Sequence, residues 1–271
     1  MTCPNEISAV LGGESQGCVV CGEALEVLAE LPPRCCGAIV MDPPFMFTTA
    51  SAGCGKLNPW ADMMNGSLWF KTLLLACERI CPDGYIWEFC NWRTVATLQK
   101  AGFDARIAIE SLLIWDKMWI AAGGSRGLHP AYEAVALFLT GNATIVNRGI
   151  PDIVRCQWSS HKPNGHPAEK PQWLCERLIE WAGDPEIIVD PFAGSGSVGA
   201  AAKVRGSRYI GIECDEAWAT YARARLAATP KPLFQPEPEK AKQGMMWEEA
   251  KWTGRGGCLR RIPLDTAAGT R

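Results

Sequence analysis

The sequence predicts an α/β fold, with one doubly wound, mostly parallel sheet of Rossmann-like type and helices on both of its faces. Two observations favour this class. Short apolar runs typical of buried strands alternate along the chain with longer segments of helical period. With 271 residues and a hydrophobic content of 48%, the chain is also long enough to bury one substantial core.

The first half of the chain supplies five predicted strands and two predicted helices. The strands are apolar runs at 18–21, 38–41, 85–89, 111–115 and 134–140. Helical patterns at 68–80 and 92–101 separate the second, third and fourth of these strands. The alternation of strand and helix favours parallel pairing, because each return needs a crossover.

The second half continues the same alternation. A helix is expected at 171–182, where Trp173, Leu174, Leu178 and Trp181 recur at helical spacing and are expected to be core residues. It is followed by a strand at 187–189, an alanine-rich helix at 197–204, a strand at 209–212 and a helix at 216–227.

The strand at 38–41 ends abruptly at Asp42-Pro43-Pro44-Phe45, because proline lacks an N–H and has a fixed φ. The turn therefore falls at the carboxyl end of a strand, which is the usual place for an α/β active site. Asp42 and the carbonyl of Pro43 can accept both hydrogens of an exocyclic amine, while Phe45 stacks on the base that carries it. An ordinary turn after a buried strand would use similar residues.

A glycine-rich turn follows the strand at 187–189, and its Asp190 lies 148 residues downstream of Asp42. Its glycines let the backbone pass close under a ligand, and the next helix presents free N–H groups there. Glu213, which ends the next strand, is placed to bind the two hydroxyls of a ribose. The spacing of Gly194, Gly196 and Gly199 also fits a nicotinamide enzyme. Asp190, ahead of the glycines, instead favours a cationic ligand such as the sulfonium of S-adenosylmethionine.

Together these residues resemble the DNA amino-methyltransferases, which methylate the exocyclic amine of adenine or cytosine. The order of the two blocks, D-P-P-[YF] before F-x-G-x-G, is similar to that of their β class. Further segments resemble family elements at 22–25, 115–117, 129–133 and 166–171. The first has Glu23 where the family usually has Asp. The resemblance covers roughly residues 18–228 and implies the methyltransferase version of the Rossmann-like fold.

The resemblance implies the roles of the site residues. The catalytic block is Asp42, Pro43, Pro44 and Phe45. The cofactor, S-adenosylmethionine, is expected to contact Glu23, Asp42, His166, Lys170, Asp190, Phe192, Ala193, Gly194, Ser195, Gly196 and Glu213. Hydrogen bonds to Asp42 and Pro43 would localise the amine lone pair for attack on the methyl group, on a base flipped out of duplex DNA.

The sequence predicts a methyltransferase domain at 1–229, with a catalytic half at about 18–140 and a cofactor half at about 166–228. The composition of residues 230–271, with eight Lys or Arg and five Asp or Glu, predicts a mobile tail. Tail and loop cations are candidates for DNA contacts: Lys56, Arg155, Lys162, Lys251, Arg255, Arg260 and Arg261. The loops at 46–66 and 141–165 are expected to lie over the flipped base and along the phosphates. Their composition is equally typical of simple connecting loops, and that of the tail is equally typical of a solvated segment.

The predicted function is methylation of adenine-N6 in double-stranded DNA, as in restriction–modification systems. An initial Asp in the block leans towards adenine in the family. Cytosine-N4 methylation is the alternative, and an NAD-dependent oxidoreductase is a more distant one. We expect a cytoplasmic protein with no membrane span and no metal site, since Cys18 and Cys21 lack a second ligand pair and would face opposite sides of a strand. The sequence indicates no cognate nuclease, and a homodimer is left open.

Overall fold

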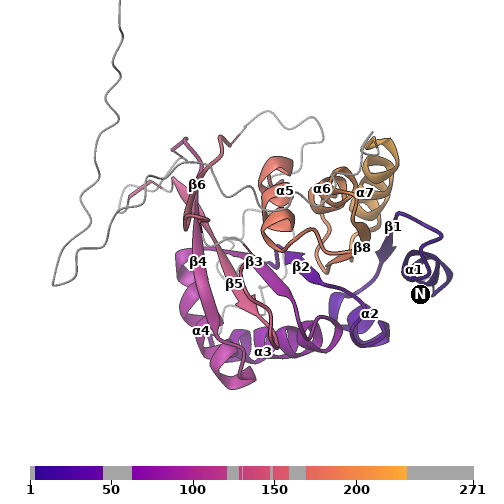
Figure 1. The fold of residues 1–271 in the computed structure, drawn as a ribbon. Coiled ribbons are helices and arrows are strands. Elements are labelled where there is room, and N and C mark those ends of the chain that lie inside the picture. The colour runs from indigo at the N-terminus through magenta and orange to yellow at the C-terminus, as the bar shows by residue number, and fades with distance from the viewer. Residues whose placement is uncertain are drawn as a thin grey trace, which may run out of the picture. The chain divides into compact units, whose positions relative to one another are not determined.

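The computed structural model describes residues 4–44, 63–120, 128–129, 131–146, 149–158 and 169–230. Their strands form an eight-stranded sheet in the order β1-β8-β7-β2-β3-β5-β4-β6 (Figure 1). The strands are β1 Gly17–Cys21, β2 Ala38–Met41, β3 Tyr85–Cys90, β4 Ile109–Asp116, β5 Tyr132–Leu139, β6 Ile153–Arg155, β7 Ile187–Asp190 and β8 Arg208–Glu213. All neighbouring pairs are parallel except those of β5, which runs against both β3 and β4.

Helices cover both faces of the sheet. One face carries α1 Pro4–Leu11, α2 Ala24–Glu30, α3 Met63–Ile80 and α4 Trp92–Ala105, and the other carries α5 Gln172–Trp181, α6 Ser197–Arg205 and α7 Glu216–Ala228 (Figure 1). Each strand contributes side chains to the cores on both faces of the sheet, because successive side chains point to opposite faces. In β2, Ile39 and Met41 pack with the first group of helices, and Ala38 and Val40 pack with the second.

The path of the chain reverses between β2 and β7. From β2 the chain crosses through α3 to β3 on one side, whereas from β7 it crosses through α6 to β8 on the other. The paired strands β2 and β7 therefore form the topological switch point of the sheet. In open α/β sheets, ligands bind outside the carboxyl ends of the strands at such a point.

Local sequence signals set the ends of several helices. The Asn91 side chain accepts hydrogen bonds from the N–H groups of Arg93 and Thr94 at the start of α4, and Asp215 does the same at the start of α7. Gly206 ends α6 with φ +83°, a left-handed conformation that glycine adopts without a steric penalty.

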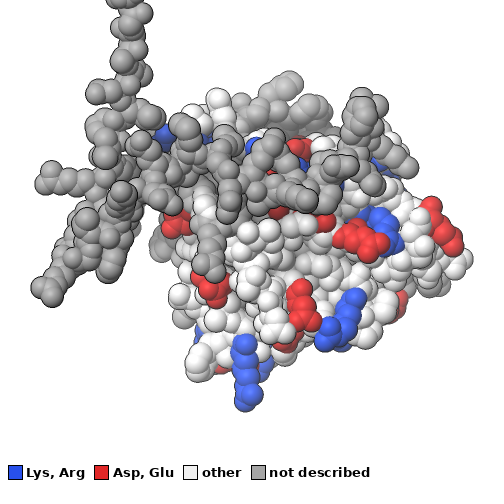
Figure 2. All heavy atoms as spheres, in the orientation of Figure 1, with Lys and Arg blue, Asp and Glu red and all other residues white. Residues whose placement is uncertain are grey.

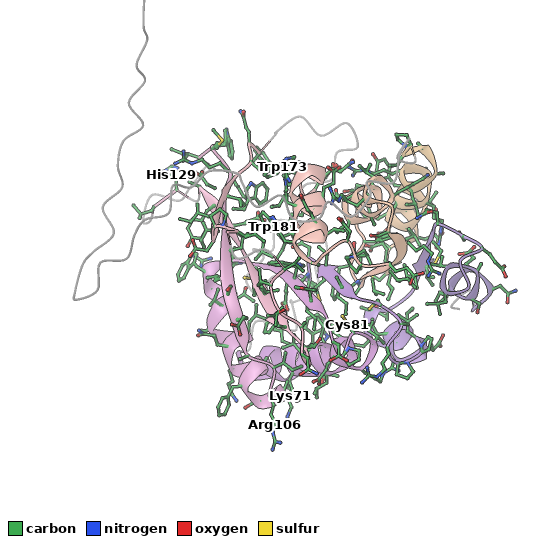
Figure 3. The ribbon with its side chains drawn as sticks, in the orientation of Figure 1. Lys71, Cys81, Arg106, His129, Trp173 and Trp181 are labelled. Atoms are coloured by element: carbon green, nitrogen blue, oxygen red, sulfur yellow. The ribbon has the colours of Figure 1, made fainter. Side chains whose placement is uncertain are left out.

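The predicted fold class is confirmed, and each predicted strand and helix overlaps an observed one. Three elements were not predicted from the sequence, α1, α2 and β6, because with eight, seven and three residues they offer little periodicity. The expectation that Trp173 is a core residue was wrong. It lies on α5 with 41% of its surface exposed, whereas Trp181 on the same helix packs with its ring centroid 6.4 Å from that of Trp87 (Figure 3).

The structure also bears on the expectations for the Cys18–Cys21 pair, for membrane spans and for the tail. Cys18 and Cys21 do pack on opposite faces of the sheet, as their spacing on a strand requires. Among the helices in the described ranges, none has the length and hydropathy needed to cross a bilayer. From residue 231 onward, the predicted basic tail lies outside the described residues.

Candidate active site

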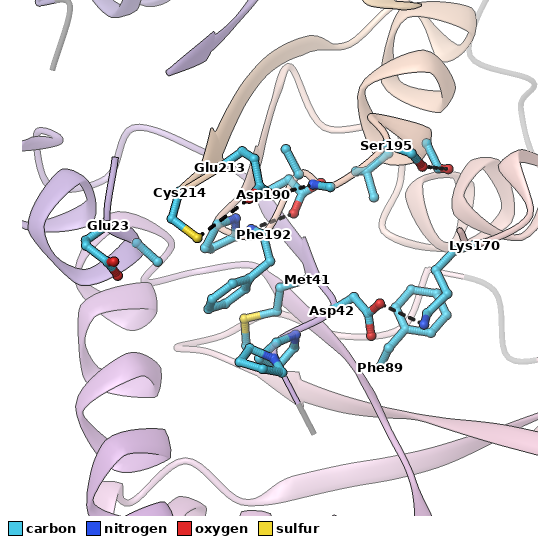
Figure 4. A pocket seen from close by; sticks show the side chains of 18 of the residues that line it. Glu23, Met41, Asp42, Phe89, Lys170, Asp190, Phe192, Ser195, Glu213 and Cys214 are labelled. Atoms are coloured by element: carbon cyan, nitrogen blue, oxygen red, sulfur yellow. Dashed lines mark hydrogen bonds and ion pairs between the residues drawn. The ribbon is translucent and has the colours of Figure 1, made fainter. Parts of the chain in front are cut away.

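A cavity of about 510 Å³ opens at the carboxyl ends of β2, β7 and β8, beside the switch point. Its walls combine apolar side chains with a few acidic ones (Figure 4). The predicted site residues that line it are Glu23, Asp42, Pro43, Pro44, Lys170, Asp190, Phe192, Ala193, Gly194, Ser195 and Glu213. Segments far apart in the sequence thus converge on one space large enough for a small-molecule ligand.

The glycine turn between β7 and α6 forms one wall of the cavity. Gly194 and Gly196 have φ values of +49° and +76°, in the left-handed region that favours glycine. Gly196 is not among the residues that line the cavity. A Cβ atom there would lie 3.1 Å from the Cα of Ala222, so Gly196 serves the close packing of α6 on α7.

Glu213, the last residue of β8, is held by the backbone around it. Its Oε2 accepts a hydrogen bond of 2.8 Å from the N–H of Gly194, and its Oε1 accepts one of 2.9 Å from the N–H of Asp215. The Cys214 thiol also donates to Oε1, over 3.6 Å, so about one of the four lone-pair sites of the carboxylate remains to accept a hydrogen bond from a ligand. The arrangement fixes an acidic group on the side of the cavity away from Asp42 (Figure 4).

Asp190, the last residue of β7, stabilises the glycine turn that follows it. Its Oδ1 accepts a hydrogen bond of 3.0 Å from the N–H of Phe192, and its Oδ2 accepts one of 3.2 Å from the hydroxyl of Tyr209. The residue is buried, and this burial raises the pKa of Asp190 from 3.8 to about 8. Its carboxyl is therefore largely protonated at neutral pH.

This raised pKa predicts a specific pH dependence of stability. Between about pH 4 and pH 8 the folded chain retains the Asp190 proton that the unfolded chain has released, so the free energy of unfolding should fall as the pH rises. Above the folded pKa the effect should level off. Asp190→Asn keeps an acceptor for the Phe192 N–H but cannot titrate. Urea denaturation across this range should show a flatter pH dependence in the variant, and equal slopes would contradict the prediction.

Asp42, directly after β2, belongs to a buried chain of alternating charges. The Nζ of Lys170 lies 2.7 Å from Asp42 Oδ2 and 3.2 Å from Glu133 Oε2, and the Nζ of Lys117 lies 2.5 Å from Glu133 Oε1. Lys170 also lies over the ring of Phe89, 5.1 Å from its centroid (Figure 4). Four charged groups from four separate segments are thus neutralised in pairs.

The two acids of this chain titrate differently. Burial raises the pKa of Asp42 above its ordinary value, while the ammonium of Lys170 acts against that increase. Burial also acts to raise the pKa of Glu133, but Lys170 and Lys117 together hold it below its ordinary value. Although burial alone would lower the pKa of Lys170, Asp42 and Glu133 raise it, so the lysine stays charged.

Eight predicted site residues lie outside the described residues: Phe45, Lys56, Lys162, His166, Lys251, Arg255, Arg260 and Arg261. Arg155, the last residue of β6, is exposed and lies 3.3 Å from Asp116 Oδ2 at the same edge of the sheet as Asp42. The assigned roles of all these residues remain predictions.

The site and its support include four residues that were not predicted from the sequence: Glu133, Lys117, Phe89 and Trp69. The segments 115–117 and 129–133 were predicted only as strand regions. The available signal was an acid and a base at the facing ends of two consecutive strands. Pairing β4 with β5 antiparallel places Lys117 and Glu133 together, because Trp115 faces Glu133 in the register.

The direction of β5 also corrects the expected role of the loop at 141–165. Since β5 is antiparallel, its carboxyl end lies at the sheet edge opposite to Asp42. Residues 141–146 start there, where the Asn142 N–H donates to Asp83 and the Tyr85 hydroxyl donates to the carbonyl of Thr144. The first part of the loop is therefore on the wrong edge to contact a base in the site. The chain returns to the Asp42 edge only through β6.

Comparison with known proteins places the chain in a family. The model of the N6/N4 DNA methylase family matches residues 37–224. The putative methylase YubD of Escherichia coli K12 is 27% identical over 219 residues, which cover 79% of this chain and 92% of that protein. Among solved structures, the M1.HpyAVI–SAM complex is 21% identical with a TM-score of 0.59, covering 78% of this chain and all of the other. The cytosine-N4-specific PvuII DNA methyltransferase is 17% identical with a TM-score of 0.63, covering 78% and 86%.

The chain belongs to the N6/N4 DNA methylase family, and it is a DNA amino-methyltransferase. The two solved structures share its fold. Family membership confirms the resemblance drawn from the sequence motifs and rules out the nicotinamide interpretation of the glycine turn.

Proposed function

We propose that this protein transfers a methyl group from S-adenosylmethionine to the N6 amine of an adenine flipped out of duplex DNA. The observation that carries the proposal is the position of Asp42. Its carboxylate ends β2 at the switch point, lines the cavity and has one oxygen held by Lys170. A carboxylate fixed in this way suits the recognition of an amine.

The cavity fits the cofactor in size and chemistry. Phe192 and Met41 offer apolar surface for a flat ring, Glu213 retains a lone pair for a ribose hydroxyl, and the turn at Gly194 lets a ligand approach the backbone. Glu23, at the start of α2, adds an acidic side chain to the same space. When bound there, S-adenosylmethionine supplies a methyl group activated on a sulfonium. The solved M1.HpyAVI–SAM complex, a relative of the same fold, supports this choice.

The protein groups orient the amine and receive its proton. Asp42 Oδ1 and the carbonyl of Pro43 accept the two amine hydrogens, which draws the nitrogen lone pair out of conjugation with the ring. Phe45, outside the described residues, is the proposed stacking platform for the base. Asp42 need not be a strong base, because the amine proton becomes acidic only once the nitrogen carries a fourth bond. Its carboxylate then takes that proton.

Adenine is favoured over cytosine by the residue that begins the catalytic block. An acid at this position leans towards adenine in the family that the block resembles, and this chain has Asp42. The fold alone supports either base, since the PvuII enzyme of the same fold is cytosine-N4-specific. Both bases present an amine that the same pair of acceptors can hold.

Sequencing that detects modified bases tests the proposal directly. DNA from a methylation-deficient host expressing the protein should contain N6-methyladenine at a recurrent short sequence. The same host expressing Asp42→Ala should lack it. N4-methylcytosine in its place would overturn the choice of base, and unmodified DNA together with inactive purified protein would overturn the function.

A separate prediction concerns the tail. Residues 230–271 carry eight Lys or Arg and five Asp or Glu, whereas the preceding residues have a net negative charge. On the face drawn in Figure 2, the described acidic and basic side chains are interspersed rather than gathered by sign. Deleting residues 230–271 should therefore weaken DNA binding about equally for all sequences and reduce the salt dependence by up to about 0.9 log unit per lost phosphate contact.

Fluorescence anisotropy at several salt concentrations measures both quantities. Affinity for S-adenosylmethionine serves as the control, because every residue proposed to hold the cofactor precedes position 230 and should bind it as before. An unchanged salt slope in the truncated protein would show that the tail does not contact DNA.

A further inference from the structure

We propose that Lys170 is a positioning residue for Asp42, holding one carboxylate oxygen so that the other is left to accept the target amine. This inference rests on the proposed function, since it assigns a role within the same site. It replaces the expectation from sequence that Lys170 serves the cofactor.

The contacts of Lys170 fix its ammonium from three sides. The residue is 7% exposed and precedes α5, on the face of the sheet opposite to α3. Its Nζ lies 2.7 Å from Asp42 Oδ2, 3.2 Å from Glu133 Oε2 and 5.1 Å from the centroid of the Phe89 ring. Lys117 holds the far oxygen of Glu133 at 2.5 Å. A lysine with this many partners has little freedom to follow a ligand.

The second carboxylate oxygen of Asp42, unlike Oδ2, has no partner among the described residues. Within the described part of the chain, Oδ1 is buried and has no hydrogen-bond partner. Such an atom is costly, because water is excluded and no donor replaces it. Since Lys170 occupies Oδ2, a donor that enters the site is directed to Oδ1. An N–H of the target amine supplies that donor.

The charge balance argues against Lys170 as an anchor for a cofactor carboxylate. Asp42 and Glu133 already share its single positive charge, and Lys117 balances the remaining negative one. A third carboxylate near Lys170 would meet two like charges in a region of low dielectric constant. The charge of Lys170 is therefore neutralised by acidic side chains of the protein and not by the cofactor.

Removal of the Lys170 charge has a defined effect on the titration of Asp42. The charged groups that act on Asp42 are Lys170 and Lys117, which lower its pKa, and Glu133, which raises it; Glu88 and Asp190 lie near enough for the charge of Asp42 to raise their own pKa values. Lys170 is the nearest cation. Without it the pKa of Asp42 rises further, and the ionised carboxylate that accepts the amine exists only at higher pH.

Lys170→Gln tests the role, since glutamine can still donate a hydrogen bond but carries no charge. The single-turnover rate of methyl transfer to DNA from a methylation-deficient host should fall by about a hundredfold, the scale of a misplaced reacting group. The acid limb of the pH–rate profile should move to higher pH. Calorimetric affinity for S-adenosylmethionine should stay within about threefold of the native value, which is below 1 kcal/mol.

Two further variants keep the test interpretable. Lys100→Gln makes the same substitution in the exposed ion pair with Asp104 on α4, so its pH–rate profile should be native. Lys170→Arg retains the charge and should recover most of the native pH–rate profile. If the glutamine variant fails to fold, the arginine variant still tests whether a positive charge at this position is sufficient. Circular dichroism and thermal denaturation establish folding for each.

The outcomes separate the possible roles. A Lys170→Gln protein that loses cofactor affinity as strongly as turnover, with an unmoved pH profile, would make Lys170 a cofactor ligand and overturn the inference. Native behaviour in both Lys170 variants would overturn it as well. If the native protein itself transfers no methyl group to DNA, the proposed function fails, whereas native activity with an unaffected Lys170→Gln variant refutes only the positioning role.

Discussion

Replacing Asp42 with alanine is expected to lower the rate of methyl transfer by at least about a hundredfold while leaving the cofactor site intact. The size is that typical of removing a preorganised polar group aimed at the reacting atom. Lys170 keeps Glu133 as a partner in this variant, so the loss of Asp42 leaves no isolated buried ammonium. Transfer of a labelled methyl group to DNA under single-turnover conditions measures the effect.

The control for this variant is the same substitution at an aspartate outside the site. Asp104 on α4 forms a surface ion pair with Lys100, and Asp104→Ala should retain native turnover because exposed pairs contribute little. Cofactor affinity should be native in both proteins. Undiminished turnover in Asp42→Ala would refute the mechanism.

Replacing Gly194 with valine is expected to abolish binding of S-adenosylmethionine. Gly194 lines the cavity, so a branched side chain there occupies space that the ligand needs. Its φ of +49° is also strained for a β-branched residue, and a shift of the turn would move the N–H that holds Glu213. Isothermal calorimetry with the purified variant should detect no binding.

Gly206→Val is the matched control, because it introduces the same strain away from the cavity. Gly206 has φ +83°, and a Cβ there would meet nothing within 4 Å. Both variants should lose stability, by about the cost of a disfavoured backbone conformation, 1–3 kcal/mol. Only Gly194→Val should lose the cofactor. Native affinity in a folded Gly194→Val protein would show that the cofactor lies elsewhere.

The parts of the site that could be predicted from sequence are those set by short stretches of chain. The prolines after Asp42 force the chain out of the sheet wherever the strand lies, and the glycines at 194 and 196 allow a left-handed turn that few other residues adopt. Because both segments end parallel strands, their meeting at one edge follows from the alternating pattern alone.

The charge chain around Asp42 could not be predicted in this way. It joins residues 42, 117, 133 and 170, and their proximity depends on the strand order and on the reversal of β5. Apolar periodicity gives the existence of a strand but not its direction, since parallel and antiparallel strands bury the same alternate side chains. The same gap explains why the loop at 141–165 was assigned to the wrong edge over its first part.

The reversal of β5 also divides the enzyme into parts that can change independently. The connection from β4 to β5 both leaves and enters the sheet at the edge where Asp42 lies, so it is the tip of a hairpin. A hairpin tip tolerates insertions, because its length does not alter the register of the strands below it. The cavity, by contrast, is lined by residues outside this connection, among them those at the ends of β2, β7 and β8 and in the turn after β7. Insertions in this connection are therefore expected to leave the lining of the cavity unchanged.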